Sequence, residues 1–154
     1  MRQIKLFTMQ HAIYTILAIS LAAILASCDL ETSSNGKLDG YWKMASIDSI
    51  ESGTAVSMKE ELRFWAFQHK LLQLIDRNSR AASYFMRFEK NGSSLRLYEP
   101  YHHKSQLSDE PLEDISKLKA YGLSEADQTF NIEKLSGSTM ILSNGKVRIN
   151  FKKY

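Results

Sequence analysis

Apolar and polar residues alternate along most of the chain after residue 38, which predicts antiparallel strands with one buried face. The clearest run is the last, where Val147, Ile149 and Phe151 alternate with polar residues. An Asn-Gly pair at 144–145 precedes it, and this pair favours a hairpin because both turn residues accept a positive φ. The predicted C-terminal meander comprises the runs 129–133, 139–143 and 146–152.

The same two-residue period continues upstream in shorter runs. Tyr84, Met86 and Phe88 share one face of a predicted strand, which turns at 91–92, an Asn-Gly pair, into a second strand. The opening strand is predicted over 41–47. Together the runs number about eight, and further apolar positions lie at Leu62, Phe64, Ala66, Leu72, Leu74, Leu95 and Leu97.

One predicted strand is apolar on both faces. Trp65 and Phe67 lie opposite to Leu62 and Phe64, so alternation does not indicate which pair faces inward. We expect Trp65 and Phe67 on the outer face, covered either by a helix of the same chain or by a partner protein.

A single segment departs from the two-residue period. Between residues 112 and 121, apolar residues recur every third position, which predicts a short amphipathic helix. Ser108 or Asp109 would cap it, Pro111 would lie in its first turn and Gly122 would follow its end. Neighbouring acidic residues are then explained by the positive end of the helix dipole rather than by a metal site.

About eight short antiparallel strands avoid exposed sheet edges most simply by closing into a barrel. The predicted fold is therefore mainly β, an eight-stranded antiparallel up-and-down barrel with one short helix. A barrel of this size encloses packed side chains or one small ligand. We expect Tyr84, Met86 and Phe88 to line its interior, where they either contact a small hydrophobic ligand or fill the space themselves.

The amino terminus has the pattern of an export signal. Arg2 and Lys5 are the charged residues before Asp29, and residues 12–25 carry no charge. The segment Leu25-Ala26-Ser27-Cys28 follows, so the chain resembles a bacterial lipoprotein precursor. That resemblance implies cleavage before Cys28 and lipidation of its thiol. The alternative is a transmembrane helix over residues 6–28, but polar residues interrupt its start.

These signals predict three parts: a signal peptide at 1–27, a lipidated Cys28 with a flexible tether over 28–37, and a barrel domain at 38–154. Lipid chains on Cys28 would anchor the protein to the membrane of the cell envelope, and we expect the outer membrane, with the domain facing the periplasm or the surface. Removal of the signal peptide takes two of the 20 basic residues, against 17 acidic ones. The nearly neutral remainder argues against nucleic acid as a partner.

Gly40 and Trp42 stand at the head of the opening strand as a Gly-x-Trp motif, so the domain resembles the lipocalins and lipocalin-like domains of bacterial lipoproteins. The resemblance implies that Trp42 lies at the closed end of the barrel under a basic residue of the last strand. Arg148 is the first choice for that residue and Lys152 the second. A cation over an indole face is worth about 0.5 to 2 kcal/mol.

Candidate catalytic and metal-binding residues are few. Composition is that of a globular protein, with 44% hydrophobic and 24% charged residues among 154. Cys28 is the single cysteine, and no nucleophile elbow or phosphate-binding loop occurs. His69 stands alone, while His102 and His103 fall in a predicted polar loop without carboxylates at ligand spacing. We therefore expect no catalysis, no metal and no cofactor.

The sequence leaves two functions open. The first is non-catalytic binding of a small hydrophobic ligand by a lipid-anchored barrel of the cell envelope. The alternative is an accessory subunit that docks onto an envelope complex through the barrel surface around Trp65 and Phe67.

Overall fold

The computed structural model describes residues 33–104 and 108–154. The predicted signal peptide, Cys28 and the first part of the tether lie outside the described residues and stay predictions. Within the described ranges, no helix has both the length and the apolar character needed to cross a membrane.

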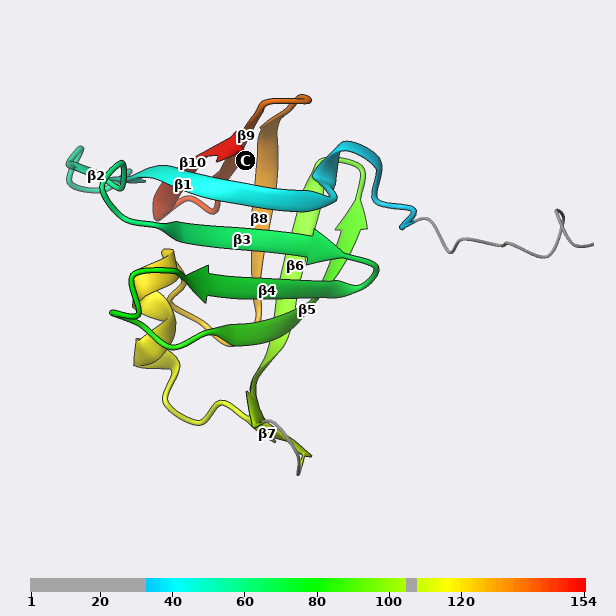
Figure 1. Ribbon diagram of the computed structural model, residues 1–154. Helices are drawn as coiled ribbons and strands as arrows, with labels where there is room; N and C mark the ends of the chain where they lie inside the picture. The colour runs from blue at the N-terminus through cyan, green and yellow to red at the C-terminus, as the bar shows by residue number, and fades with distance from the viewer. Residues whose placement is uncertain (1–32, 105–107) are drawn as a thin grey trace, which may run out of the picture. The chain divides into compact units, whose positions relative to one another are not determined.

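Eight antiparallel strands close into a barrel (Figure 1), which confirms the predicted fold class. Each of these strands pairs with the next one along the chain, and the last also pairs with the first. The barrel strands are β1 (Gly40–Ser49), β3 (Arg63–Gln68), β4 (Leu71–Asp76), β5 (Tyr84–Asn91), β6 (Ser94–Lys104), β8 (Gln128–Leu135), β9 (Thr139–Ser143) and β10 (Val147–Lys153).

Four smaller elements complete the fold. Strand β2 (Ala55–Ser57) pairs with the second half of β1, and β7 (Ser108–Pro111) pairs with the second half of β6. Two 3-10 helices, η1 (Gly36–Leu38) and η2 (Ile115–Tyr121), lie beside opposite ends of the barrel (Figure 1). These ends are called the η1 end and the η2 end below.

Large side chains fill the barrel interior. Trp65 is fully buried, with ring centroids 4.9 Å from Phe151 and 6.1 Å from Phe130, which are contributed by other strands. Phe67 is also buried and meets Phe88 edge-on at 5.1 Å. The expectation that Trp65 and Phe67 form an outer docking surface is therefore wrong. The face of β3 with the larger side chains packs into the core, because it buries more apolar surface.

The outer face of β3 is covered by the chain itself. Phe64 points away from the core cluster, yet it is only 1% exposed. The Tyr154 ring meets it edge-on at 5.1 Å, and the Arg77 guanidinium lies 5.0 Å from its centroid. The C-terminal residue and one loop arginine thus cover a surface for which the sequence suggested a helix or a partner.

Helix η2 is shorter than predicted and of a different type. It begins at Ile115 rather than 112, and the Asp114 side chain caps it by accepting a hydrogen bond from the Ser116 N–H. A strict three-residue repeat is the period of a 3-10 helix, in which residues i and i+3 eclipse. Leu118 and Tyr121 consequently share the buried face, while the predicted capping residues and Pro111 belong to β7, and residues 112–114 connect β7 to η2.

The end of the predicted tether is hydrogen-bonded to the barrel. Ser33 Oγ donates to Asp39 Oδ1 at 2.7 Å, and Asn35 Nδ2 donates to the His69 carbonyl at 2.7 Å in the β3–β4 turn. Residues 33–37 are therefore part of the folded domain rather than a flexible spacer. The polar side chains that suggested a tether form specific contacts at the η1 end.

Candidate functional site

A cleft of about 650 Å³ opens at the η2 end, between the start of β5 and the segment that connects β7 to η2. Its walls combine aromatic, aliphatic and charged side chains from four elements and their connections. The lining residues are Ala82, Tyr84, His102, Glu110, Pro111, Leu112, Glu113, Asp114 and Lys117.

Tyr84 forms the inner wall of this cleft. The residue is 5% exposed, and its ring lies 5.9 Å from the His102 ring and 6.4 Å from Tyr121. No group in the described ranges forms a hydrogen bond with its hydroxyl. Burial, assisted by the negative charge of Asp114, raises the pKa of Tyr84 above its ordinary value. The hydroxyl is therefore a neutral group available to a ligand.

Polar contacts hold η2 beside the cleft. The Tyr121 hydroxyl donates to the Ala82 carbonyl at 2.7 Å, and burial raises the pKa of this phenol well above its usual range. Arg63 donates to the Ala120 carbonyl at 3.0 Å and to the carboxylate of buried Asp76 at 3.3 Å. These bonds position the helix over the barrel opening without filling the space beside Tyr84.

The rim of the cleft is mainly acidic. Glu110, Glu113 and Asp114 outnumber the one lysine of the lining, Lys117. Asp114 also accepts hydrogen bonds from Ser116, whose hydroxyl lowers the pKa of this carboxyl. A ligand entering the cleft would thus meet carboxylates at its mouth and aromatic rings further in.

The two adjacent histidines belong to a strand rather than to the predicted loop. His102 and His103 lie in β6, opposite Glu110 and Asp109 of β7. The predicted loop was wrong because backbone pairing with β7 extends the strand through a polar sequence. His102 lines the cleft. Among the described residues, no three His, Cys, Asp or Glu side chains are grouped as a metal ion would require.

The three predicted ligand-binding residues follow the inner face of β5 but have different surroundings. Tyr84 lines the cleft. Met86 is fully buried among core side chains, and Phe88 packs against Phe67. The structure therefore limits the cleft to the η2 end of the strand and assigns the middle of the barrel to packing.

The η1 end is closed by Trp42 and Lys153. Trp42 is fully buried, and its Nε1 donates to the Leu38 carbonyl at 2.7 Å. The Lys153 ammonium lies 4.3 Å from the indole centroid, and it also donates to the Asp39 carbonyl. Gly40 adopts a positive φ of 101°, and a Cβ there would lie 3.1 Å from Lys153 Nζ, which explains the glycine of the motif.

The predicted pairing of Trp42 with Arg148 is therefore wrong, as is the second choice, Lys152. Arg148 points outward and donates to Glu133 at 2.9 and 3.1 Å. Lys152 is exposed, whereas Lys153 lies two residues after the buried Phe151 and therefore on the inner face of β10. Alternation along β10 was the signal that could have identified Lys153 in the sequence.

Sequence reasoning also missed most of the cleft. His102 was treated as part of a loop, and Leu112 and Lys117 as parts of one regular helix. The cleft depends on β7 pairing with β6, and the sequence of β7 carries no alternation of apolar residues. The periodicity of the sequence therefore could not predict how far β7 and the β7–η2 connection lie from the start of β5, which is the distance that sets the width of the cleft.

Comparison with known proteins places this fold in a family. Residues 23–154 match the family described as lipocalin-like domain. A lipocalin-like protein from Bacteroides uniformis ATCC 8492 is 20% identical, with a TM-score of 0.59 over 77% of this chain and 100% of its own. An uncharacterized protein from Bacteroides eggerthii DSM 20697 is 14% identical, with a TM-score of 0.53 over 76% and 99%.

No curated protein matches the sequence. At these identities the two solved structures support the fold, while the family match covers most of the chain, including all the described residues. The chain belongs to the lipocalin-like domain family.

Proposed function

We propose that this protein is a lipid-anchored component of the bacterial cell envelope that binds a small, largely apolar molecule in the cleft at the η2 end. Binding rather than catalysis is the activity that a lipocalin-like domain supports. The observation that carries the proposal is a cleft of about 650 Å³ with the nearly buried Tyr84 as its inner wall. Sites for small ligands start at about 300 Å³.

The chemistry of the cleft indicates the features of such a ligand. An apolar body would replace water against Tyr84 and Leu112, and a hydrogen-bonding group would reach the Tyr84 hydroxyl. A positively charged group would be favoured over a negative one, because Glu110 and Glu113 stand at the mouth. A neutral or cationic amphipathic molecule therefore fits better than a fatty acid.

The anchoring part of the proposal is supported by the sequence. A basic start, an uncharged stretch at 12–25 and Leu25-Ala26-Ser27-Cys28 are together typical of lipoproteins. Cleavage before Cys28 and acylation of its thiol would attach the barrel to the envelope, and we propose the outer membrane as the location. Mass spectrometry of the protein from bacterial membranes tests this step, and a Cys28→Ser chain should leave the membrane fraction.

Dye binding tests the cleft. Residues 33–154 contain every barrel strand and the whole core cluster and form one compact unit, so this fragment is used for the assay. An environment-sensitive apolar dye should bind once per chain. Ala82→Trp, which places an indole in the cleft, should weaken binding about tenfold or more, whereas Ala55→Trp on exposed β2 should not. Equal binding by all three chains would refute the cleft as the site.

A further inference from the structure

The η1 end carries lysines that the protein does not neutralise. Lys37, Lys70 and Lys90 are exposed, and none forms an ion pair with any residue in the described ranges. Lys70 and Lys90 line a pocket of about 350 Å³ together with Asn35 and His69. Two ammonium groups and polar donors in one pocket are the chemistry that binds a phosphate group.

The carboxylates near this pocket are already engaged. Glu89 accepts a hydrogen bond from the Tyr98 hydroxyl at 3.2 Å and lies 3.6 Å from an Arg96 nitrogen. Asp39 accepts hydrogen bonds from Ser33 and Asn35. These contacts leave both carboxylates charged, and Glu89 lines the pocket itself, but Lys37, Lys70, Lys90 and Lys153 outnumber them four to two, so the η1 end keeps an excess of positive charge.

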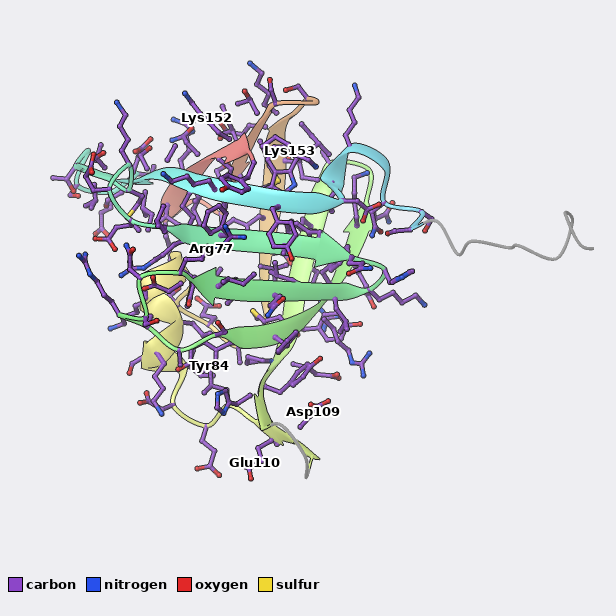
Figure 2. The ribbon with its side chains drawn as sticks, in the orientation of Figure 1. Arg77, Tyr84, Asp109, Glu110, Lys152 and Lys153 are labelled. Atoms are coloured by element: carbon purple, nitrogen blue, oxygen red, sulfur yellow. The ribbon has the colours of Figure 1, made fainter. Side chains whose placement is uncertain are left out.

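At the opposite end of the barrel, the rim of the ligand cleft is mainly acidic. Glu110, Glu113 and Asp114 surround the ligand cleft with Lys117 as the one opposing lysine of its lining. Figure 2 shows Lys153 far from Glu110 across the molecule. The lysines of the η1 end and the acidic rim of the cleft thus lie at opposite ends of the barrel.

The described chain also begins at the positive end. Ser33 is fixed there by its hydrogen bond to Asp39 and by the His69 N–H, which donates to Ser33 Oγ at 3.1 Å. Ser33 lies five positions after Cys28, and five residue steps span at most about 18 Å. An acyl anchor on Cys28 would therefore hold the η1 end, rather than the cleft, close to the bilayer.

We propose that the η1 end is a membrane-docking surface, in which Lys70, Lys90 and Lys37 bind the phosphate groups of anionic lipids. This inference rests on the anchor in the proposed function. Docking fixes the direction of the barrel, so that the cleft at the η2 end opens away from the membrane. Each lysine near an anionic surface favours the docked orientation about fivefold, and removing two shifts that equilibrium about thirtyfold.

The test uses the full acylated chain in vesicles of phosphatidylcholine, either alone or mixed with phosphatidylglycerol. A fluorophore is attached through Ser93→Cys at the η1 end or through Ser124→Cys beside η2, and energy transfer to a headgroup acceptor is measured. Lys70→Gln with Lys90→Gln removes the charges of the pocket. The matched control is Lys59→Gln with Lys119→Gln, which removes the same charge from exposed lysines elsewhere.

On anionic vesicles, transfer from position 93 should exceed transfer from position 124. The difference should narrow for the Lys70/Lys90 variant, on neutral vesicles and in 1 M salt, where the screening length falls to about 3 Å. The control variant should show the same difference in energy transfer as the unsubstituted chain. Equal transfer from both positions, or the same loss in both double variants, would overturn the docking surface.

The proposal of a lipid anchor and the proposal of a docking surface can be refuted independently. The mass of the amino-terminal peptide reports acylation of Cys28 independently of orientation. An unacylated chain would refute the anchor, and its sedimentation with the two vesicle types then tests the lysines directly. Sedimentation with anionic vesicles that the Lys70/Lys90 variant loses would support headgroup binding, and sedimentation that is independent of lipid charge would refute it.

Discussion

The two ends of the barrel are closed in different ways. At the η1 end, Leu38 and Trp42 are fully buried and the Lys153 ammonium lies over the indole. At the η2 end, a short 3-10 helix covers the core through Leu118 and Tyr121, but the space beside Tyr84 stays open. One end is sealed by aromatic packing, and the other is covered by a helix that buries two side chains and is also held by hydrogen bonds from Arg63 and Tyr121.

The residues that stabilise this small domain and the residues that could bind a ligand therefore lie mostly in different parts of the barrel. The ring of large side chains at the η1 end and in the middle of the barrel provides most of the buried apolar area, so no ligand is needed to complete the core. The η2 end supplies the varied polar groups that a binding site requires. Substitutions at the two ends should therefore have distinct effects, which the following predictions test.

The largest effect is expected for Trp42→Ala. Loss of a fully buried indole, and of its hydrogen bond to Leu38, should lower the free energy of unfolding by about 3 to 5 kcal/mol. Urea denaturation of residues 33–154 measures this loss. Trp42→Phe should retain most of the packing and lose far less. A loss below about 1 kcal/mol in the alanine variant would contradict the role of Trp42 in closing the barrel.

The next effect is expected for Asp76→Ala at the η2 end. The Asp76 carboxylate is fully buried, pairs with Arg63 and accepts hydrogen bonds from the Asn78 and Ala81 N–H groups at 2.8 and 3.1 Å. Its removal leaves two backbone donors without a partner and Arg63 with Glu61, at 3.5 Å, as its remaining ion-pair partner, which should cost about 2 to 4 kcal/mol.

Because Arg63 also donates a hydrogen bond to the Ala120 carbonyl, the Asp76→Ala substitution should also destabilise η2. Hydrogen exchange should then increase in residues 115–121 more than in β9. Glu60→Ala, at an exposed position just before β3, is the control and should change neither measurement. Unchanged exchange in η2 would show that the Arg63–Asp76 pair does not hold this helix.

The fold was predictable where one face of each strand is polar. In the C-terminal meander, alternation and the Asn-Gly pair at 144–145 predicted the strands and the turn that joins the last two, and the structure confirms them. Alternation did not resolve β3, because Phe64 and Trp65 are both large and apolar. The choice between them depends on the volume of the interior, which is set by residues on the other strands.

The candidate site was predictable only in part. Tyr84 was identified because it shares a face with Met86 and Phe88. The segment around Asp109 resembles the start of a helix, but in the structure it forms a strand that pairs with β6. Backbone hydrogen bonds between distant segments override such local preferences, so the shape of the cleft follows from tertiary structure.

A smaller effect is expected for Lys153→Gln at the sealed end. Loss of the Lys153 side chain, with its contact to the Trp42 indole and its hydrogen bonds to the Asp39 and Lys37 carbonyls, should lower the free energy of unfolding by about 0.5 to 1 kcal/mol at neutral pH. Burial lowers the pKa of Lys153, so the folded chain releases this proton more readily than the unfolded chain.

The contribution of Lys153 to stability should therefore rise as pH approaches 10.5 from below, and then level off. Urea denaturation of both chains between about pH 8 and 10.5 gives this difference. Lys152→Gln, on the outer face of the same strand, should show no such dependence. If the two variants behave alike, Lys153 does not close the barrel in solution.

The smallest change in stability is expected for Tyr84→Phe, which removes only a hydroxyl that lacks a partner among the described residues. The urea midpoint should stay nearly constant. Affinity for a ligand with a hydrogen-bonding group should fall about three- to tenfold, because one hydrogen bond contributes about 0.5 to 1.5 kcal/mol. Binding of a purely apolar dye should not change, because the phenylalanine ring would keep the same apolar surface.

Alkaline titration provides a second measurement of the same variant. Burial raises the pKa of Tyr84, Tyr98, Tyr101 and Tyr121, so Tyr84 should contribute one of several late ionisations. Tyr84→Phe should remove one of these late ionisations, and a bound ligand should delay it further in the wild-type chain. If the ligand alters neither the titration nor the affinity ratio, it binds outside the cleft, and the polar end of the barrel would then have a structural rather than a binding role.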